Sequence, residues 1–152
     1  MNLRERLLGA WELIDGKMRS DSPTADFEFS PQRGGRGLII YSGSGYMAVT
    51  LSKGLRPPFA SGQLDGGTDD EKARAFSTYM SYTGTFEVDE TEGWVTHRVR
   101  YASFPNFVGQ SLVRYPTFSG PSGQPGDEVC LNTQLTNTND KIGNSYLTWR
   151  KL

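Results

Sequence analysis

The sequence contains a single histidine, His97, in a stretch whose alternating residues are typical of a β-strand. Strand alternation puts three further residues on the same face as this histidine: Val95, Val99 and Tyr101. Two arginines fall on the opposite face, which should meet solvent, so we expect His97 to point inward. A neutral imidazole there could bind a ligand, or it could act as a general acid or base near neutral pH. A core histidine held by a neighbouring hydroxyl is an equally good interpretation.

Arg114 is a second candidate for chemistry, because it lies mid-strand and shares a face with Leu112. If that face is inward, the guanidinium needs a carboxylate or a ligand oxyanion to offset its desolvation. In a catalytic barrel, His97 would move a proton and Arg114 would stabilise developing negative charge. Either Tyr101 or Tyr46 would hold a substrate oxygen.

The chain has seven tyrosines, whose apolar bodies and polar tips suit a pocket for one oxygen of an otherwise apolar ligand. Each could equally be a core or girdle residue. Arg56 precedes Pro57-Pro58, where a loop could fold over the pocket, although a surface position is the alternative. The expected catalytic residues are His97, Tyr101 and Arg114. The expected ligand-binding residues are Tyr41, Tyr46, Arg56, Tyr79, Tyr82, Val99 and Leu112.

Metal, cofactor and hydrolase chemistry have little support in the sequence. One histidine and one cysteine, Cys130, are too few for a typical zinc site, and neither His-X-His nor Cys-X-X-Cys spacing occurs. Gly43-Ser44-Gly45 lies in a predicted hairpin turn, whereas a hydrolase nucleophile sits at a strand-to-helix elbow. We therefore expect neither a metal nor a cofactor.

Charge and cysteine content narrow the expected partners and location. Sixteen basic and 17 acidic residues give a formal net charge of −1 and are scattered, so we expect no nucleic-acid partner. Residues 1–8 carry charges within their apolar spacing, which predicts neither a signal peptide nor a membrane span. A single cysteine forms no internal disulfide and favours a reducing compartment. These features predict a cytoplasmic protein.

The positions of apolar residues predict a single domain, 1–152, built mainly of strands joined by hairpins. A short amino-terminal helix should cover one end of it. Thr68 and Glu71 form a capping box for a second helix, which should run to about Tyr82 and pack an apolar stripe on the strands. Residues 20–35 read as a long loop, and an exposed edge segment at 27–29 leaves a homodimer possible. The predicted strands are 9–14, 38–41, 46–51, 83–88, 94–101, 108–115, 128–135 and 145–152.

About eight strands in a meander should close into an up-and-down β-barrel, because closure pairs the exposed sheet edges. Helices between successive strands, which a parallel sheet requires, are missing from the pattern. A barrel of this size has room for side chains and one small ligand.

Several short motifs lie in order along the chain: Gly9-Ala10-Trp11, 37–41, 45–47, 79–88, His97, 105–109, Arg114 and 147–150. The first matches the Gly-X-Trp signature of lipocalins. The whole series resembles the lipocalin-like domain family of bacteria and fungi. The resemblance implies an all-β, lipocalin-like barrel with a central pocket, but it brings no established catalytic residues. It also implies a basic residue of the final strand over Trp11, and the sequence leaves Arg150 and Lys151 as alternatives.

Two functions follow as hypotheses. In the first, the barrel binds a small, largely apolar metabolite and promotes a cofactor-free isomerisation or cyclisation, with shape and proximity supplying much of the catalysis. In the second, the protein is a carrier or sensor that binds and releases such a ligand unchanged. Measuring ligand affinity and turnover separately would distinguish them.

Overall fold

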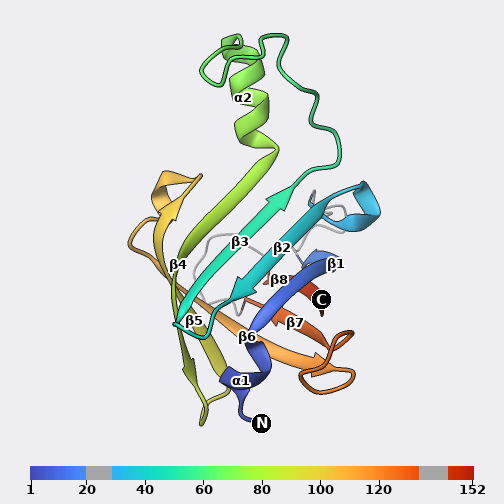
Figure 1. The fold of residues 1–152 in the computed structure, drawn as a ribbon, viewed down its shortest axis with the longest axis vertical. Coiled ribbons are helices and arrows are strands. Elements are labelled where there is room, and N and C mark those ends of the chain that lie inside the picture. The colour runs from blue at the N-terminus through green and yellow to red at the C-terminus, as the bar shows by residue number, and fades with distance from the viewer. Residues whose placement is uncertain (20–28, 134–143) are drawn as a thin grey trace.

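A computed structural model describes residues 1–19, 29–133 and 144–152, and in these residues the chain forms a closed antiparallel barrel (Figure 1). Each strand pairs with the next in the sequence, and the last pairs with the first. The predicted all-β, lipocalin-like barrel is thereby confirmed. The strands are β1 (Gly9–Arg19), β2 (Arg36–Tyr41), β3 (Tyr46–Ser52), β4 (Tyr79–Asp89), β5 (Trp94–Ala102), β6 (Ser111–Ser119), β7 (Glu128–Asn132) and β8 (Asn144–Lys151).

Alternation along each strand separates an apolar inner face from a more polar outer face. In β3, Met47, Val49 and Leu51 are buried, whereas the intervening residues are more exposed. Burying an aliphatic side chain of this size stabilises the fold by about 1.5–3 kcal/mol. The inner faces meet in one core, whose largest fully buried side chains are Trp11, Trp149, Tyr41, Leu7, Ile39 and Leu51.

β1 is longer than the sequence predicts, because it does not end at Asp15-Gly16. Leu13 pairs with Trp149 and Asp15 pairs with Thr148, so Ile14 is an extra residue in a β-bulge. The bulge absorbs the turn-prone residues, and β1 goes on pairing with β8 as far as Arg19.

A second bulge changes which residues of β5 face inward. Gly84 of β4 pairs with Val99 and Thr83 pairs with Tyr101, so Arg100 is extra. The extra residue reverses the alternation, and Tyr101 therefore lies on the outer face with 74% of its side chain exposed. The inward orientation predicted for Tyr101 is wrong. A side chain on Gly84 would collide with the Arg98 carbonyl oxygen, so glycine permits this close approach.

The short helix α1 (Leu3–Leu7) lies at one end of the barrel, as predicted (Figure 1). Its Asn2 and Glu5 form a capping box, and the Glu90 carboxylate accepts hydrogen bonds from the backbone amides of Leu3 and Arg4. Leu7 is buried, and its carbonyl oxygen accepts a 2.8 Å hydrogen bond from Trp11 Nε1. The signature tryptophan thus joins α1 to the barrel.

An ionic cluster ties α1 to β7 and β8. The Arg6 guanidinium donates two 2.8 Å hydrogen bonds to the buried Asp127 carboxylate, and Lys151 Nζ donates to the Arg6 carbonyl oxygen. Hydrogen bonding to Arg6 holds the pKa of Asp127 below its usual value. Lys151 Nζ also lies 5.0 Å from the centre of the Trp11 ring, while Arg150 pairs with Glu128. Lys151 is therefore the basic residue over the tryptophan.

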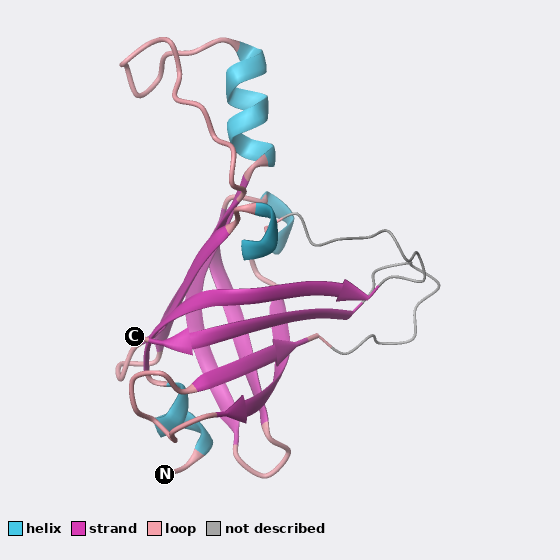
Figure 2. Cartoon of the chain, turned by 90° about the vertical axis from the view of Figure 1, so that its right-hand side faces the viewer, coloured by secondary structure: helices cyan, strands magenta, loops and turns pink. Residues whose placement is uncertain are grey.

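The second helix, α2 (Asp69–Ser77), starts at the predicted capping box of Thr68 and Glu71, but it ends five residues before Tyr82. The Thr78 hydroxyl bonds to the Arg74 carbonyl oxygen at the carboxyl end, and β4 begins at Tyr79 because residues 79–85 pair with β3. The helix projects from the barrel (Figure 2) and has no buried residue; Phe76 is 55% exposed. The prediction that it packs on the barrel is wrong.

The remaining differences concern loops and strand ends. Residues 105–107, next to the predicted start of β6, form a short 3-10 helix, η2 (Pro105–Phe107), and β6 starts at Ser111. β6 also runs through Pro116, which pairs with Leu131. Residues 27–28 of the predicted edge segment, and residues 134–135 of the predicted seventh strand, lie outside the described residues. None of the helices in the described ranges is long and apolar enough to span a membrane.

Candidate functional site

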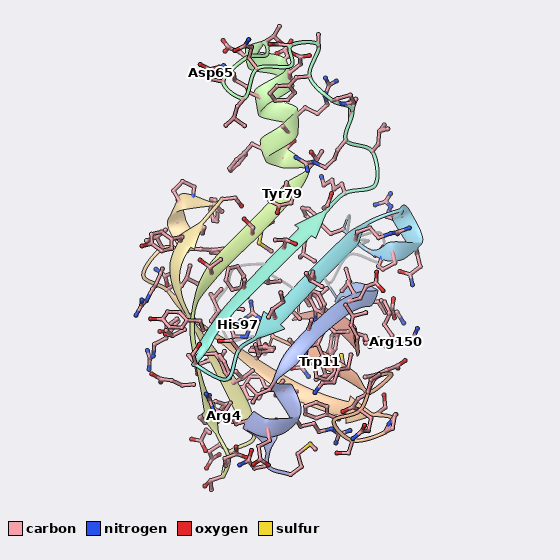
Figure 3. The ribbon with its side chains drawn as sticks, in the orientation of Figure 1. Arg4, Trp11, Asp65, Tyr79, His97 and Arg150 are labelled. Atoms are coloured by element: carbon pink, nitrogen blue, oxygen red, sulfur yellow. The ribbon has the colours of Figure 1, made fainter. Side chains whose placement is uncertain are left out.

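The sole histidine, labelled in Figure 3, lies buried inside the barrel, as the sequence predicts. His97 Nε2 is 2.7 Å from the Tyr41 hydroxyl oxygen, and Nδ1 is 2.9 Å from that of Tyr82. The three residues come from β5, β2 and β4 respectively, so the barrel's closure is what brings them together. We refer to Tyr41, His97, Tyr82 and the nearby Arg114 as the interior polar cluster.

Burial keeps the imidazole of His97 uncharged. Desolvation, helped by the positive charge of Arg114, lowers the pKa of His97 to about 3. A neutral imidazole has one N–H donor and one acceptor nitrogen, and the two tyrosines can satisfy both. Burial also raises the pKa of Tyr41 and that of Tyr82, so both phenols are neutral at physiological pH.

Arg114 lies on the inner face of β6, where it pairs with the buried Val95. Its charge lowers the pKa of Tyr82, against the larger effect of burial, which places the guanidinium near the phenol oxygen. One guanidinium nitrogen donates to the neighbouring Val113 carbonyl oxygen at 2.9 Å. No carboxylate among the described residues forms a salt bridge with it. Arg114 is therefore a half-buried cation with capacity for a further acceptor.

Apolar side chains surround the interior polar cluster. Val99, two residues after His97 in β5, is buried. Leu112 pairs directly with His97 and packs on the core. The Phe86 ring meets Tyr41 edge-on at 4.9 Å between centroids. The Phe107 ring meets Tyr82 in the same way at 6.0 Å. Such a surrounding suits an apolar ligand that carries one polar group.

The structure places other predicted site residues away from this cluster. Tyr46 is on the outer face of β3, 51% exposed, with the Arg100 guanidinium 5.3 Å from its ring centre. Together with Tyr101 it is unable to reach a molecule inside the barrel, so placing these two tyrosines on a ligand oxygen was wrong. Both errors concern strand faces: Tyr46 alternates out of the core, and Tyr101 follows the bulge.

Arg56 and Tyr79 lie at the base of α2 instead. The Arg56 guanidinium bonds to the Thr78 hydroxyl at 3.1 Å and stacks 4.8 Å from the Tyr79 ring centre. Arg56 lines a separate pocket of about 290 Å³ between α2 and the preceding loop. The other lining residues are Pro57, Pro58, Phe59, Glu71, Arg74, Ala75 and Thr78. Arg56 is exposed, which agrees with the surface alternative, and the pocket beside it is not lined by the interior polar cluster.

Trp149 is a residue that the sequence analysis did not single out. It lies on the inner face of β8, 1% exposed, and pairs with Leu13 and Val129, which are also buried. Of the buried side-chain polar atoms in the described residues, its Nε1 is the one without a hydrogen-bond partner. Alternation with Arg150 predicts its inward orientation, but no sequence pattern reveals an unpaired N–H.

The described residues contain no group of three or more histidine, cysteine, aspartate or glutamate side chains that could hold a metal ion. The interior polar cluster itself offers one imidazole, and both of its nitrogens are engaged. What the arrangement can do is donate hydrogen bonds and present positive charge to an oxygen-bearing molecule.

Comparison with known proteins agrees with the barrel and its motifs. The chain is 36% identical over 113 residues to the 4'-hydroxy-3'-methoxypropiophenone carrier protein ppsC of Aspergillus oryzae, a match that covers 70% of this chain and 96% of that protein. The family model of the lipocalin-like domain matches residues 8–152. The chain belongs to the lipocalin-like domain family.

Proposed function

We propose that this protein is a carrier that holds a small, largely apolar, oxygen-bearing organic molecule inside the barrel and releases it unchanged. The observation that carries the proposal is the interior polar cluster: a neutral Tyr41–His97–Tyr82 chain beside the cation of Arg114, enclosed by apolar side chains. A few polar groups among apolar side chains are typical of small-molecule sites, where they fix the orientation of the ligand.

The state of His97 favours carriage over catalysis. A general acid or base works best with a pKa near the working pH, and a histidine with a pKa of about 3 is a very weak base at pH 7. Both ring nitrogens are also within hydrogen-bond distance of tyrosines, which leaves neither one free for a substrate proton. The proposal therefore gives His97 the role of orienting Tyr41 and Tyr82.

The similarity to a protein named as a carrier supports the same function. That relative's name specifies an aromatic ketone with a phenol and a methoxy group, which is a small apolar body bearing several oxygens. A ligand of this type would place one oxygen against the tyrosines and Arg114, and its ring against Leu112 and Val99. Membership of the lipocalin-like family agrees with hydrophobic ligand binding.

Cofactor-free isomerisation or cyclisation is the second candidate, and Arg114 is the observation that favours it. A half-buried cation beside two neutral phenols could stabilise negative charge that develops on a substrate oxygen. In that case a tyrosine would donate the proton, since both ring nitrogens of His97 are engaged by tyrosine hydroxyls. This candidate requires that the bound molecule be chemically altered.

Binding is tested by titrating the protein with 4'-hydroxy-3'-methoxypropiophenone and following heat and tryptophan fluorescence. We expect Tyr82→Phe and Arg114→Met each to weaken binding about 10- to 100-fold, the range for a lost hydrogen bond to a charged or buried group. Tyr101→Phe and Arg100→Met are matched controls, because both residues are exposed on the outer face. Controls that weaken binding as much as the interior variants would contradict the proposed site.

Release of an unchanged ligand is tested by incubating stoichiometric and catalytic amounts of protein with the same ketone and analysing the extract by chromatography and mass spectrometry. A carrier returns the starting compound. A new product in the presence of wild-type protein, lost in Arg114→Met but retained in His97→Ala, would instead establish the second candidate. Absence of any binding would remove both.

A further inference from the structure

The barrel wall opposite Tyr82 carries a buried hydrogen-bond donor with no partner among the described residues, Trp149 Nε1. In a closed barrel of eight strands, β8 and β4 are four strands apart in either direction, so these two strands form opposite walls. Arg150 is exposed on the outer face and pairs with Glu128, whereas Trp149 is 1% exposed within the core. The indole therefore belongs to the interior of the barrel.

An unpaired buried N–H is unusual, since nearly all buried polar groups in folded proteins have a partner. The contrast with Trp11 shows this within the same core: Trp11 Nε1 donates to the Leu7 carbonyl oxygen at 2.8 Å. An indole N–H donates and never accepts. Any group that pairs with the Trp149 N–H must therefore be a hydrogen-bond acceptor, such as a carbonyl or ether oxygen.

We propose that the indole N–H of Trp149 donates a hydrogen bond to an acceptor oxygen of the ligand, at the end away from the interior polar cluster. This inference rests on the proposed function and narrows its ligand class. The ligand is an apolar molecule with two separated oxygen functions: one reached by Tyr82 and Arg114, and an acceptor such as a ketone reached by Trp149. A molecule that lacks the acceptor leaves the indole N–H unpaired and binds more weakly.

Two probes isolate the second oxygen. 4'-Hydroxy-3'-methoxypropiophenone and 2-methoxy-4-propylphenol share the ring, phenol, methoxy group and three-carbon chain, and they differ in the ketone oxygen. At a pH that keeps both phenols protonated, we expect the ketone to bind about tenfold more tightly, as one added hydrogen bond allows. In Trp149→Phe, which keeps an aromatic ring without the N–H, this preference disappears, whereas Trp94→Phe, at the partly exposed start of β5, retains it.

A measurement on the unaltered protein avoids dependence on how Trp149→Phe folds. The chain has three tryptophans, so an indole ¹H–¹⁵N spectrum contains three signals, which through-space contacts with neighbouring protons in the wild-type protein assign. Saturating ketone should move the Trp149 proton downfield as its hydrogen bond forms, and the phenol without a ketone should not. The Trp11 signal, whose proton is already bonded to Leu7, should stay in place with either probe.

The outcomes separate this inference from the proposed function. If the ketone binds and the Trp149 signal behaves the same with both probes, the inference is wrong although the carrier function stands. If both probes bind equally well to the wild type, the acceptor has no role and the inference is also overturned. If neither probe binds in calorimetry, the proposed function fails and takes the inference with it.

Discussion

The Tyr41 hydroxyl and His97 Nε2 lie 2.7 Å apart, although strands β2 and β5 that carry them are far apart in the sequence. Tyr41→Phe removes the hydroxyl and leaves a buried imidazole nitrogen without that partner. Because an unsatisfied buried polar group is costly, we expect the free energy of unfolding to fall by about 1–3 kcal/mol. Urea unfolding measures this, with the exposed Tyr101→Phe as a control that should change stability by less than about 0.5 kcal/mol.

The single histidine makes the pKa of His97 directly measurable. Its folded value of about 3 lies below the unfolded value of 6.5. NMR of the imidazole carbons should therefore show no titration between pH 8 and pH 5. A midpoint near 6.5 would mean that the ring is solvated and that the interior polar cluster is not formed in solution.

The lowered pKa of His97 determines how the stability of the folded barrel changes with pH. Between pH 6.5 and 3 the unfolded chain binds a proton at His97 that the folded barrel does not bind, so stability rises with pH across this window. The slope is about 1.4 kcal/mol per pH unit in the middle of the window, and it vanishes above pH 6.5. Urea unfolding at several pH values should show this slope in the wild type. In His97→Gln the contribution of the histidine to the slope should be absent.

Asp127 is the buried centre of the ionic cluster at the α1 end. Asp127→Asn leaves the Arg6 guanidinium without its two 2.8 Å hydrogen bonds to a carboxylate. Loss of a buried charge partner is expected to cost about 3 kcal/mol, reduced somewhat because Arg6 is partly exposed. Glu128→Gln breaks the largely exposed pair with Arg150 and should cost less than about 1 kcal/mol. If thermal unfolding shows the same loss of stability for Asp127→Asn and Glu128→Gln, the two ion pairs do not differ in burial as described.

The contributions of Lys151 and Arg150 to stability can be distinguished by substituting each one. Lys151→Met removes the cation 5.0 Å from the Trp11 ring centre and should lower the free energy of unfolding by about 0.5–2 kcal/mol. Arg150→Met removes a cation that points outward and should have a smaller effect. A larger loss in Arg150→Met would mean that the tryptophan does not depend on the cation above it.

The sequence predicted the barrel because its evidence is repeated along the chain: short alternating strands, glycine-containing turns and the ordered motifs around Trp11, His97 and Arg114. His97 and Arg114 could be placed inward because their neighbours in the strand are clearly polar or apolar. Alternation after residue 99 gave Tyr101 the wrong face, since the extra residue at Arg100 has no sequence signature.

Other parts of the site depend on long-range contacts that a local pattern does not contain. The partners of His97 come from β2 and β4, and only closure of the barrel selects Tyr41 and Tyr82 from the seven tyrosines. The helical spacing of Phe76 and Tyr79 predicts an apolar face that packs on the barrel. In the structure Tyr79 pairs with Ser52 in the sheet, so the helix ends before it. The helix α2 extends away from the barrel (Figure 2).

The extra residue at Arg100 also bears on how the length of this strand can vary among relatives. Beyond the bulge Tyr101 pairs with Thr83 and Ala102 pairs with Tyr82, so a chain without the extra residue would keep both pairs and the faces on which they lie. A single codon could therefore be lost or gained at this point without changing which side chains beyond Val99 face the interior of the barrel.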